Sequence, residues 1–112
     1  HQMIFDVGDK TIKLISENIL NSRMILWNGP LGAFEYKPFN NASEKIANFI
    51  KKNSEKLNIT CLAGGGDTIA VIKSINAQSG FSYISNAGGA FLQWLEGKDL
   101  PGVISLKQNY FN

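Results

Sequence analysis

A run of glycines followed by an acidic residue most clearly suggests chemistry in this sequence: Gly64, Gly65 and Gly66 precede Asp67 and Thr68. Because glycine has no Cβ atom, the backbone N–H groups of such a turn can approach a ligand closely. A helix starting there would add free N–H groups and the positive end of its dipole, which favour phosphate. The Asp67 carboxylate could hold Mg²⁺, which usually binds one or two carboxylates together with phosphate oxygens and water.

The same residues also fit a plain strand-to-helix turn in which Asp67 caps the helix. Successive glycines, however, cost backbone entropy that a simple turn does not require. The segment matches neither of two common nucleotide motifs. No Gly-Lys-Ser/Thr follows at the Walker A spacing, and Ile69 stands at the third glycine position of the dinucleotide fingerprint. Both interpretations stay open for this turn taken alone.

A second glycine segment, Asn-Ala-Gly-Gly-Ala at residues 86–90, has the same character. Close packing of a helix against a sheet explains Gly88 and Gly89 slightly better than ligand binding does when the segment is taken alone. Phosphate-compatible loops at a shared sheet edge, however, suggest a polyphosphate or a pair of phosphorylated ligands more strongly than either loop does by itself.

Glu35 lies in a long segment, residues 28–40, in which no helix or strand is expected. Long loops in compact domains are commonly functional. The Glu35 carboxylate could accept hydrogen bonds from vicinal hydroxyls such as those of a ribose, while Pro30, Leu31 and Phe34 offer an apolar wall. A solvated loop glutamate is the commoner situation, so composition alone does not assign this residue.

The other reactive side chains and the overall charge exclude several classes of function. Cys61 is expected in the core and His1, the only histidine, lies at the terminus, so neither predicts a nucleophile or general base. Eleven Lys and Arg against nine Asp and Glu leave a net charge of +2, too small to capture nucleic acid. No apolar stretch approaches a membrane span. A single cysteine fits a reducing compartment, so we expect a cytoplasmic protein.

The pattern of apolar residues predicts the elements that position these segments. Short apolar runs predict strands at residues 24–27, 59–63, 81–85 and 103–106. Helical spacing predicts helices at residues 11–21, 41–53, 68–76 and 88–96. Asn41 and Glu44 form a helix-start box at the second of these. The alternation predicts an α/β fold, a partial Rossmann-like parallel sheet with helices on both faces in three layers (α/β/α). The glycine loops that follow the first three strands are then expected at one sheet edge, where ligands bind in such folds.

Several segments together resemble one known family. Residues 27–35 (Trp-Asn-Gly-Pro-Leu-Gly-Ala-Phe-Glu) look like the signature segment of phosphoglycerate kinases, and residues 64–68 resemble that family's second nucleotide loop. Residues 6–11 are similar to the segment that precedes the signature. The stretches that resemble the closing part of the family's sequence are residues 85–90, 95–98 and 100–103. The similarity runs in order over residues 4–106.

The resemblance implies a glycolytic kinase of two domains that transfers a phosphoryl group between 1,3-bisphosphoglycerate and ADP, giving 3-phosphoglycerate and ATP. The nucleotide would be bound with Mg²⁺. Residues 1–112 would be the C-terminal portion of the nucleotide-binding domain. The N-terminal domain, which holds 3-phosphoglycerate in the family, would be absent, so the chain is expected to be inactive in isolation. The full-length enzyme is expected to be a cytoplasmic monomer.

Carried over residue by residue, the resemblance implies that Glu35 binds the ribose hydroxyls and that Asn28 lies near the phosphates. The residues implied to line the nucleotide cleft are Pro30, Ala33 and Phe34. Those implied to hold the phosphates are Gly65, Gly66, Asp67 and Thr68, with Asp67 also on Mg²⁺. The backbone N–H groups of Gly88 and Gly89 would face the phosphoryl group during transfer.

Two positions depart from the family pattern, and two other classes of function stay open. Ala87 stands where a third glycine is usual, which would alter one backbone approach to the phosphate, and Asp9 stands where proline is usual. The chain could instead be a non-catalytic nucleotide-binding or regulatory α/β module. It could also be a structural fragment that folds only with the remainder of a longer chain.

Overall fold

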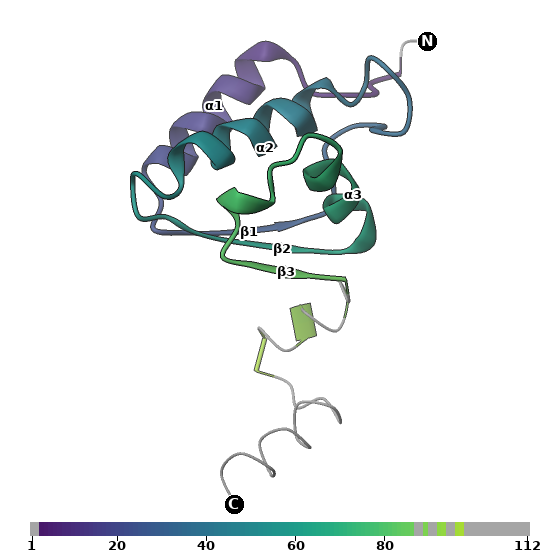
Figure 1. Ribbon diagram of the computed structural model, residues 1–112. Coiled ribbons are helices and arrows are strands. Elements are labelled where there is room, and N and C mark those ends of the chain that lie inside the picture. The colour runs from purple at the N-terminus through teal and green to yellow at the C-terminus, as the bar shows by residue number, and fades with distance from the viewer. Residues whose placement is uncertain (1–2, 87–88, 90–91, 94–95, 98–112) are drawn as a thin grey trace, which may run out of the picture.

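The computed structural model describes residues 3–86, 89, 92–93 and 96–97. The elements follow in the order α1 (Asp9–Leu20), β1 (Met24–Asn28), α2 (Asn41–Asn53), β2 (Thr60–Gly64), α3 (Gly66–Ser74), a short 3-10 helix η1 (Gln78–Gly80) and β3 (Tyr83–Ser85) (Figure 1). The predicted helices and strands up to residue 85 are confirmed, with boundaries that differ by two residues or fewer. The strand predicted at residues 103–106 and most of the helix predicted at 88–96 lie outside the described residues.

The sheet is parallel, with β1, β2 and β3 side by side in chain order. Its register pairs Asn28 with Gly64 and Gly64 with Ser85, which are the last residues of the three strands. The predicted α/β fold with a parallel sheet is therefore confirmed. In the part of the chain that the structure describes, no helix is long and apolar enough to cross a membrane.

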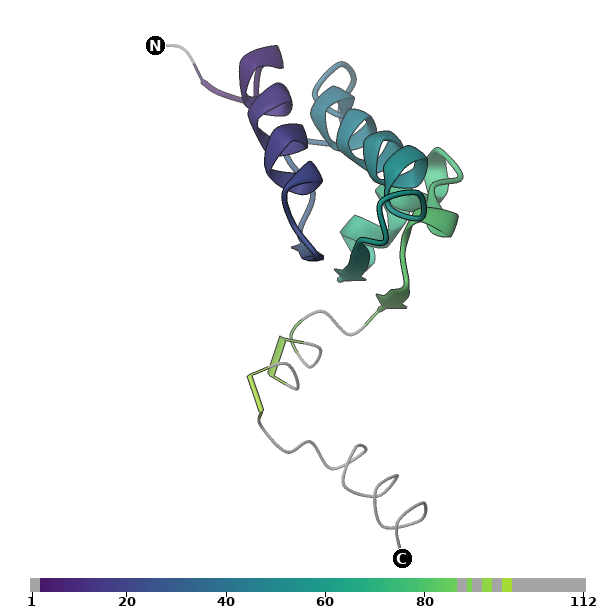
Figure 2. The ribbon, with the colours of Figure 1, turned by 90° about the vertical axis from the view of Figure 1, so that its left-hand side faces the viewer.

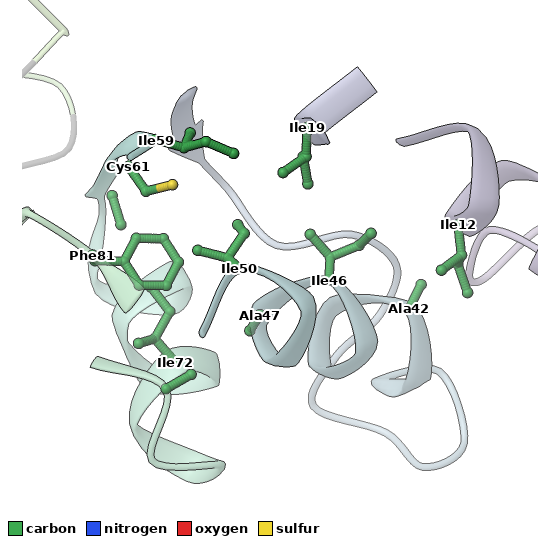
Figure 3. Close-up of a cluster of buried hydrophobic side chains, with 12 residues drawn as sticks. Ile12, Ile19, Ala42, Ile46, Ala47, Ile50, Ile59, Cys61, Ile72 and Phe81 are labelled. Atoms are coloured by element: carbon green, nitrogen blue, oxygen red, sulfur yellow. The ribbon is translucent and has the colours of Figure 1, made fainter. Parts of the chain in front are cut away.

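Helices α1, α2 and α3 lie over the same face of the sheet (Figures 1 and 2). Helical positions three or four apart face inward, as the 3.6-residue period predicts. The buried side chains that meet beneath these helices include Ile12, Ile19, Ala42, Ile46, Ala47, Ile50, Ile59, Cys61, Ile72 and Phe81 (Figure 3). Cys61 is a core residue, as expected, and burial raises the pKa of its thiol.

The opposite face of the sheet is open to solvent in the described part of the chain. Along β1, Ile25 and Trp27 pack against the core, whereas Met24 and Leu26 are 65% and 44% exposed. Tyr83 is 51% exposed. The elements from α1 to β3 thus form two of the three predicted layers, which are the sheet and one layer of helices (Figure 2).

The start of α2 differs from the sequence prediction. Asn40, not Asn41, is the N-cap residue, and its side-chain amide donates to the Glu44 carboxylate at 2.6 Å instead of capping the helix. The Ala42 N–H in the first turn is bound by the Asp6 carboxylate, at 3.1 Å. The predicted helix-start box at Asn41 and Glu44 is therefore wrong. The carboxylate of Asp6, a residue distant in sequence, accepts the hydrogen bond from the first turn of α2 instead.

Candidate functional site

The carboxyl ends of β1, β2 and β3 lie next to one another at one edge of the sheet, as the sequence predicts for its glycine loops. The N–H of Gly65, just after β2, donates to the carbonyl of Ser85 at the end of β3, at 2.9 Å. Asn86 follows directly, while Ala87 and Gly88 lie outside the described residues. Gly89 is helical and exposed, and a Cβ atom there would meet nothing within 4 Å.

The loops after β1 and β2 are joined by one buried hydroxyl. Thr68, in the first turn of α3, is fully buried, and its Oγ1 accepts the Gly29 N–H at 2.7 Å. Gly65 has a φ of +93°, and a Cβ atom on it would lie 3.2 Å from Oδ1 of Asn28. We call Asn28, Gly29, Gly65 and Thr68 the strand-end junction. The predicted residues Asn28, Gly65 and Thr68 are thus brought together, with Gly29 added by the structure.

The first turn of α3 leaves N–H groups free at this edge. The first α-helical bond there runs from Ile69 N to Gly65 O at 3.1 Å, so the N–H groups of Gly66, Asp67 and Thr68 precede the helical ladder. At Gly66 a Cβ atom would meet nothing within 4 Å. Free N–H groups at a helix start are suited to an anion.

Asp67 does not cap α3. The N-cap residue is Gly65 and no side chain bonds to the cap, so the ordinary capping role considered for Asp67 is wrong. The Asp67 carboxylate is exposed and has no hydrogen-bond or ion-pair partner among residues 3–86. The described residues contain no group of three or more acidic, histidine or cysteine side chains suited to a metal ion. A single carboxylate fits Mg²⁺ that brings phosphate oxygens and water as its other ligands.

Residues 28–40, which begin with the last residue of β1 and which we call the 28–40 loop, are held by partners outside the loop as well as by turn hydrogen bonds within it. Ser43 Oγ of α2 accepts the Leu31 N–H and donates to the Leu31 carbonyl, both at 2.7 Å, and Ser43 is fully buried. The Ala33 N–H donates to the Phe5 carbonyl at 2.7 Å. The Trp27 indole N–H donates to the Gly29 carbonyl at 2.6 Å. Neither Ser43 nor Phe5 could be predicted from the sequence, because nothing in their local spacing indicates a partner in this loop.

Glu35 and Phe34 line a hollow apart from the strand-end junction. Its volume is about 270 Å³ and it lies between the 28–40 loop, the start of α2 and α3. The other lining residues are Lys37, Asn40, Glu44, Ala70, Val71 and Ser74. Pro30 is half-buried and Ala33 lines a different, shallow hollow beside residues 4–7. The predicted cleft residues are thus carried by one loop but do not share one pocket among the described residues.

Comparison with known proteins agrees with the resemblance seen in the sequence. A family model described as phosphoglycerate kinase matches residues 1–98. The phosphoglycerate kinase of Cereibacter sphaeroides is 49% identical over 104 residues, which cover 93% of this chain and 26% of that protein. That of a Chelativorans species is 44% identical over 106 residues, covering 95% of this chain and 27% of the relative. The solved structure of phosphoglycerate kinase from Coxiella burnetii has a TM-score of 0.79 at 39% identity, over 95% of this chain and 26% of that one. The chain spans about a quarter of the length of these relatives.

Proposed function

Since the chain belongs to the phosphoglycerate kinase family, we propose that residues 1–112 are the C-terminal portion of the nucleotide-binding domain of a two-domain glycolytic kinase. The proposed reaction is phosphoryl transfer between 1,3-bisphosphoglycerate and ADP, giving 3-phosphoglycerate and ATP. The proposed partners of this segment are the Mg-bound nucleotides, and 3-phosphoglycerate would bind to a domain outside it. Alone, the 112-residue chain is then expected to have no turnover, because positioning both substrates supplies most of the catalysis.

The observation that carries this proposal is the strand-end junction. Phosphoryl transfer requires placement and charge neutralisation rather than a protein nucleophile. The hydrogen bond from Gly29 to Thr68 fixes the loops after β1 and β2 relative to each other. Beside it, the first turn of α3 offers free N–H groups and an unpaired carboxylate. Burial raises the pKa of the Cys61 thiol and so disfavours a thiolate, but the proposed reaction needs no thiolate.

Each of these backbone and side-chain groups then has a proposed role in binding the nucleotide. The N–H groups of Gly66 and Asp67 would bind phosphate oxygens, and the Asp67 carboxylate would hold the Mg²⁺ that accompanies them. Bound Mg²⁺ neutralises charge on the phosphates. Thr68 would act by holding Gly29 in place, since its hydroxyl already accepts that N–H. Glu35 would bind the ribose hydroxyls, and Gly88 and Gly89 would face the transferred group with their N–H groups.

The experiment that tests this function replaces Asp67 by Asn in the full-length protein. Asn keeps the size of the side chain and one acceptor oxygen, so what is lost is the charge that attracts the metal. We expect kcat to fall about a hundredfold, because the metal contributes several kcal/mol to the transition state. Binding of Mg-nucleotide should weaken more than binding of metal-free nucleotide, measured by titration with and without Mg²⁺.

Asp9→Asn is the matched control, because Asp9 is an exposed carboxylate in the first turn of α1. It removes the same charge and should leave both titrations unchanged. If Asp67→Asn loses the same affinity for nucleotide with and without Mg²⁺, Asp67 does not bind the metal. Nucleotide binding by the wild-type full-length protein without any turnover would support the alternative, a non-catalytic nucleotide-binding module.

A further inference from the structure

Residues 4–8, which we call the N-terminal strap, run along the 28–40 loop and the start of α2 before α1 begins (Figure 1). The strap has no helix or strand of its own. Its backbone nevertheless contacts the loop directly, because the Phe5 carbonyl accepts the Ala33 N–H at 2.7 Å. The rings of Phe5 and Phe39 pack with centroids 5.0 Å apart. The strap therefore touches the loop near its middle and near its end.

Asp6 is the polar centre of this contact. Its Oδ1 accepts the N–H of Val7 at 2.9 Å, and its Oδ2 accepts the N–H of Ala42 in α2 at 3.1 Å. The carboxylate is half-buried. One side chain thus fixes the strap and the first turn of α2 at the same time. A carboxylate at a helix start also interacts favourably with the helix dipole.

The same carboxylate packs against the loop where the loop has no side chain. Gly32 has a φ of +65°, and a Cβ atom there would lie 2.5 Å from Oδ1 of Asp6 and 2.6 Å from the Phe5 carbonyl oxygen. Real Cβ atoms essentially never come this close to another atom. Only glycine at position 32 therefore lets the strap approach the loop. Gly32 lies three positions before Glu35.

We propose that Asp6 is a positioning residue for the nucleotide site. It fixes the strap against Gly32 and the start of α2, which holds the 28–40 loop in the conformation that presents Glu35 to the nucleotide. This inference rests on the proposed function for the role of Glu35, whereas the positioning of the loop rests on the contacts of Asp6 alone. Asp6 itself touches no substrate in this proposal.

The test compares Asp6→Ala, Asp6→Asn, Asp9→Ala and Glu35→Ala in the full-length protein. Asp9 is the matched control, because it lies near the strap but its carboxylate is 88% exposed in an ion pair of 3.3 Å with Lys45. Such exposed pairs contribute little. The measurements are kcat, the KM for nucleotide, the KM for 3-phosphoglycerate, and amide hydrogen exchange at Ala33 and Ala42.

In Asp6→Ala we expect the KM for nucleotide to rise about tenfold, because the two hydrogen bonds that fix the strap and the start of α2 beside the loop are lost. The KM for 3-phosphoglycerate should stay unchanged. A general loss of stability would instead lower the measured turnover and leave both KM values unchanged, because it only reduces the amount of folded enzyme. The Ala33 and Ala42 amides should exchange faster. Asp6→Asn keeps one acceptor oxygen and should show a smaller rise of about threefold, so it also serves if Asp6→Ala does not fold. Asp9→Ala should behave as the wild type.

The outcomes separate the positioning role from the function on which it rests. Wild-type exchange at Ala33 and Ala42 in both Asp6 variants would overturn the positioning role, whatever Glu35→Ala does. Faster exchange together with an unchanged KM for nucleotide would show that the position of the loop does not affect nucleotide binding, which would overturn that part of the proposal. If Glu35→Ala leaves the KM for nucleotide unchanged while the Asp6 variants alter exchange, the proposed ribose role fails and the positioning of the loop stands.

Discussion

The loops that follow β1 and β2 meet at one sheet edge but are held in different ways. The glycine turn at residues 64–66 is short, and its restraints meet at Gly65, which adopts a positive φ, caps the start of α3 and donates its N–H to the Ser85 carbonyl of β3. The 28–40 loop depends on distant groups, Thr68, Ser43 and the Phe5 carbonyl. The short turn is therefore restrained at one residue, whereas the long loop is held at points that are spread over much of the chain.

This difference affects how each loop responds to mutation. A substitution in the glycine turn should act where it is made, because the restraints of this turn meet at the backbone of Gly65. The 28–40 loop should respond to substitutions far from it, at its holding points. Thr68 is the exception that links both, because it belongs to α3 and holds Gly29. Amide hydrogen exchange in the full-length protein measures each loop separately, since exchange reports local opening.

The largest expected effect is that of Ser43→Ala, which should loosen the long loop alone. The variant leaves the Leu31 N–H and carbonyl without their partner, and we expect the free energy of opening of the 28–40 loop to fall by about 3 kcal/mol. Exchange at Leu31 should accelerate while exchange at Gly65 does not change. Ser16→Ala is the control, because the Ser16 hydroxyl bonds to Ile12 within its own helix. Acceleration at Gly65 as well would mean that the loops are not independent.

Thr68→Val should affect both loops, since it removes the hydroxyl that joins them. Val has nearly the same shape, so the main loss is the acceptor of the Gly29 N–H, and we expect about 2 kcal/mol. Exchange at Gly29 and Gly65 should both accelerate, and nucleotide should bind more weakly. Thr68→Ser retains the hydroxyl and should restore most of the binding. Failure of this rescue would show that the methyl group, rather than the hydrogen bond, carries the effect.

Gly65→Ala should disturb the glycine turn and leave the part of the 28–40 loop beyond Asn28 undisturbed. The positive φ of +93° and the nearby Asn28 side chain disfavour a Cβ atom, and we expect a cost of about 1.5 kcal/mol. Gly66→Ala is the matched control one residue on, where a Cβ atom meets open space. It should leave stability unchanged or raise it slightly, because Ala at a position with an ordinary φ loses less backbone entropy on folding than Gly. Equal costs for the two substitutions would contradict a turn held by the conformation of Gly65.

The smallest expected effect is that of Trp27→Phe, which tests whether Gly29 is held from both sides. The variant removes the indole N–H that donates to the Gly29 carbonyl and keeps an aromatic ring beside Phe81. Because this hydrogen bond is exposed, we expect a loss of about 0.5 kcal/mol, confined to exchange near Gly29. A loss as large as that of Thr68→Val would mean that the indole, not the threonine, fixes the loop.

The pattern of apolar residues and glycines was enough to predict the order and kind of the elements and the edge at which the candidate site lies. Helix α2 has the predicted bounds, residues 41–53, because its apolar positions recur with a helical period. The alternation of strands and helices was enough to predict a parallel sheet, and a parallel sheet brings the ends of its strands to one edge. These inferences succeed because periodicity and turn chemistry act between residues close together in the chain.

The groups that hold the candidate site, in contrast, are selected by how the elements pack. Asp6 and Ala42 are 36 positions apart, and Gly29 and Thr68 are 39 apart, so no local spacing could pair them. The resemblance implies that Thr68 is among the phosphate ligands, whereas in the structure its buried hydroxyl accepts the Gly29 N–H. A buried polar group must find a partner, but which partner it finds depends on how the elements pack. The sequence therefore places the loops at one edge, and packing selects the hydrogen bonds that give them their shape.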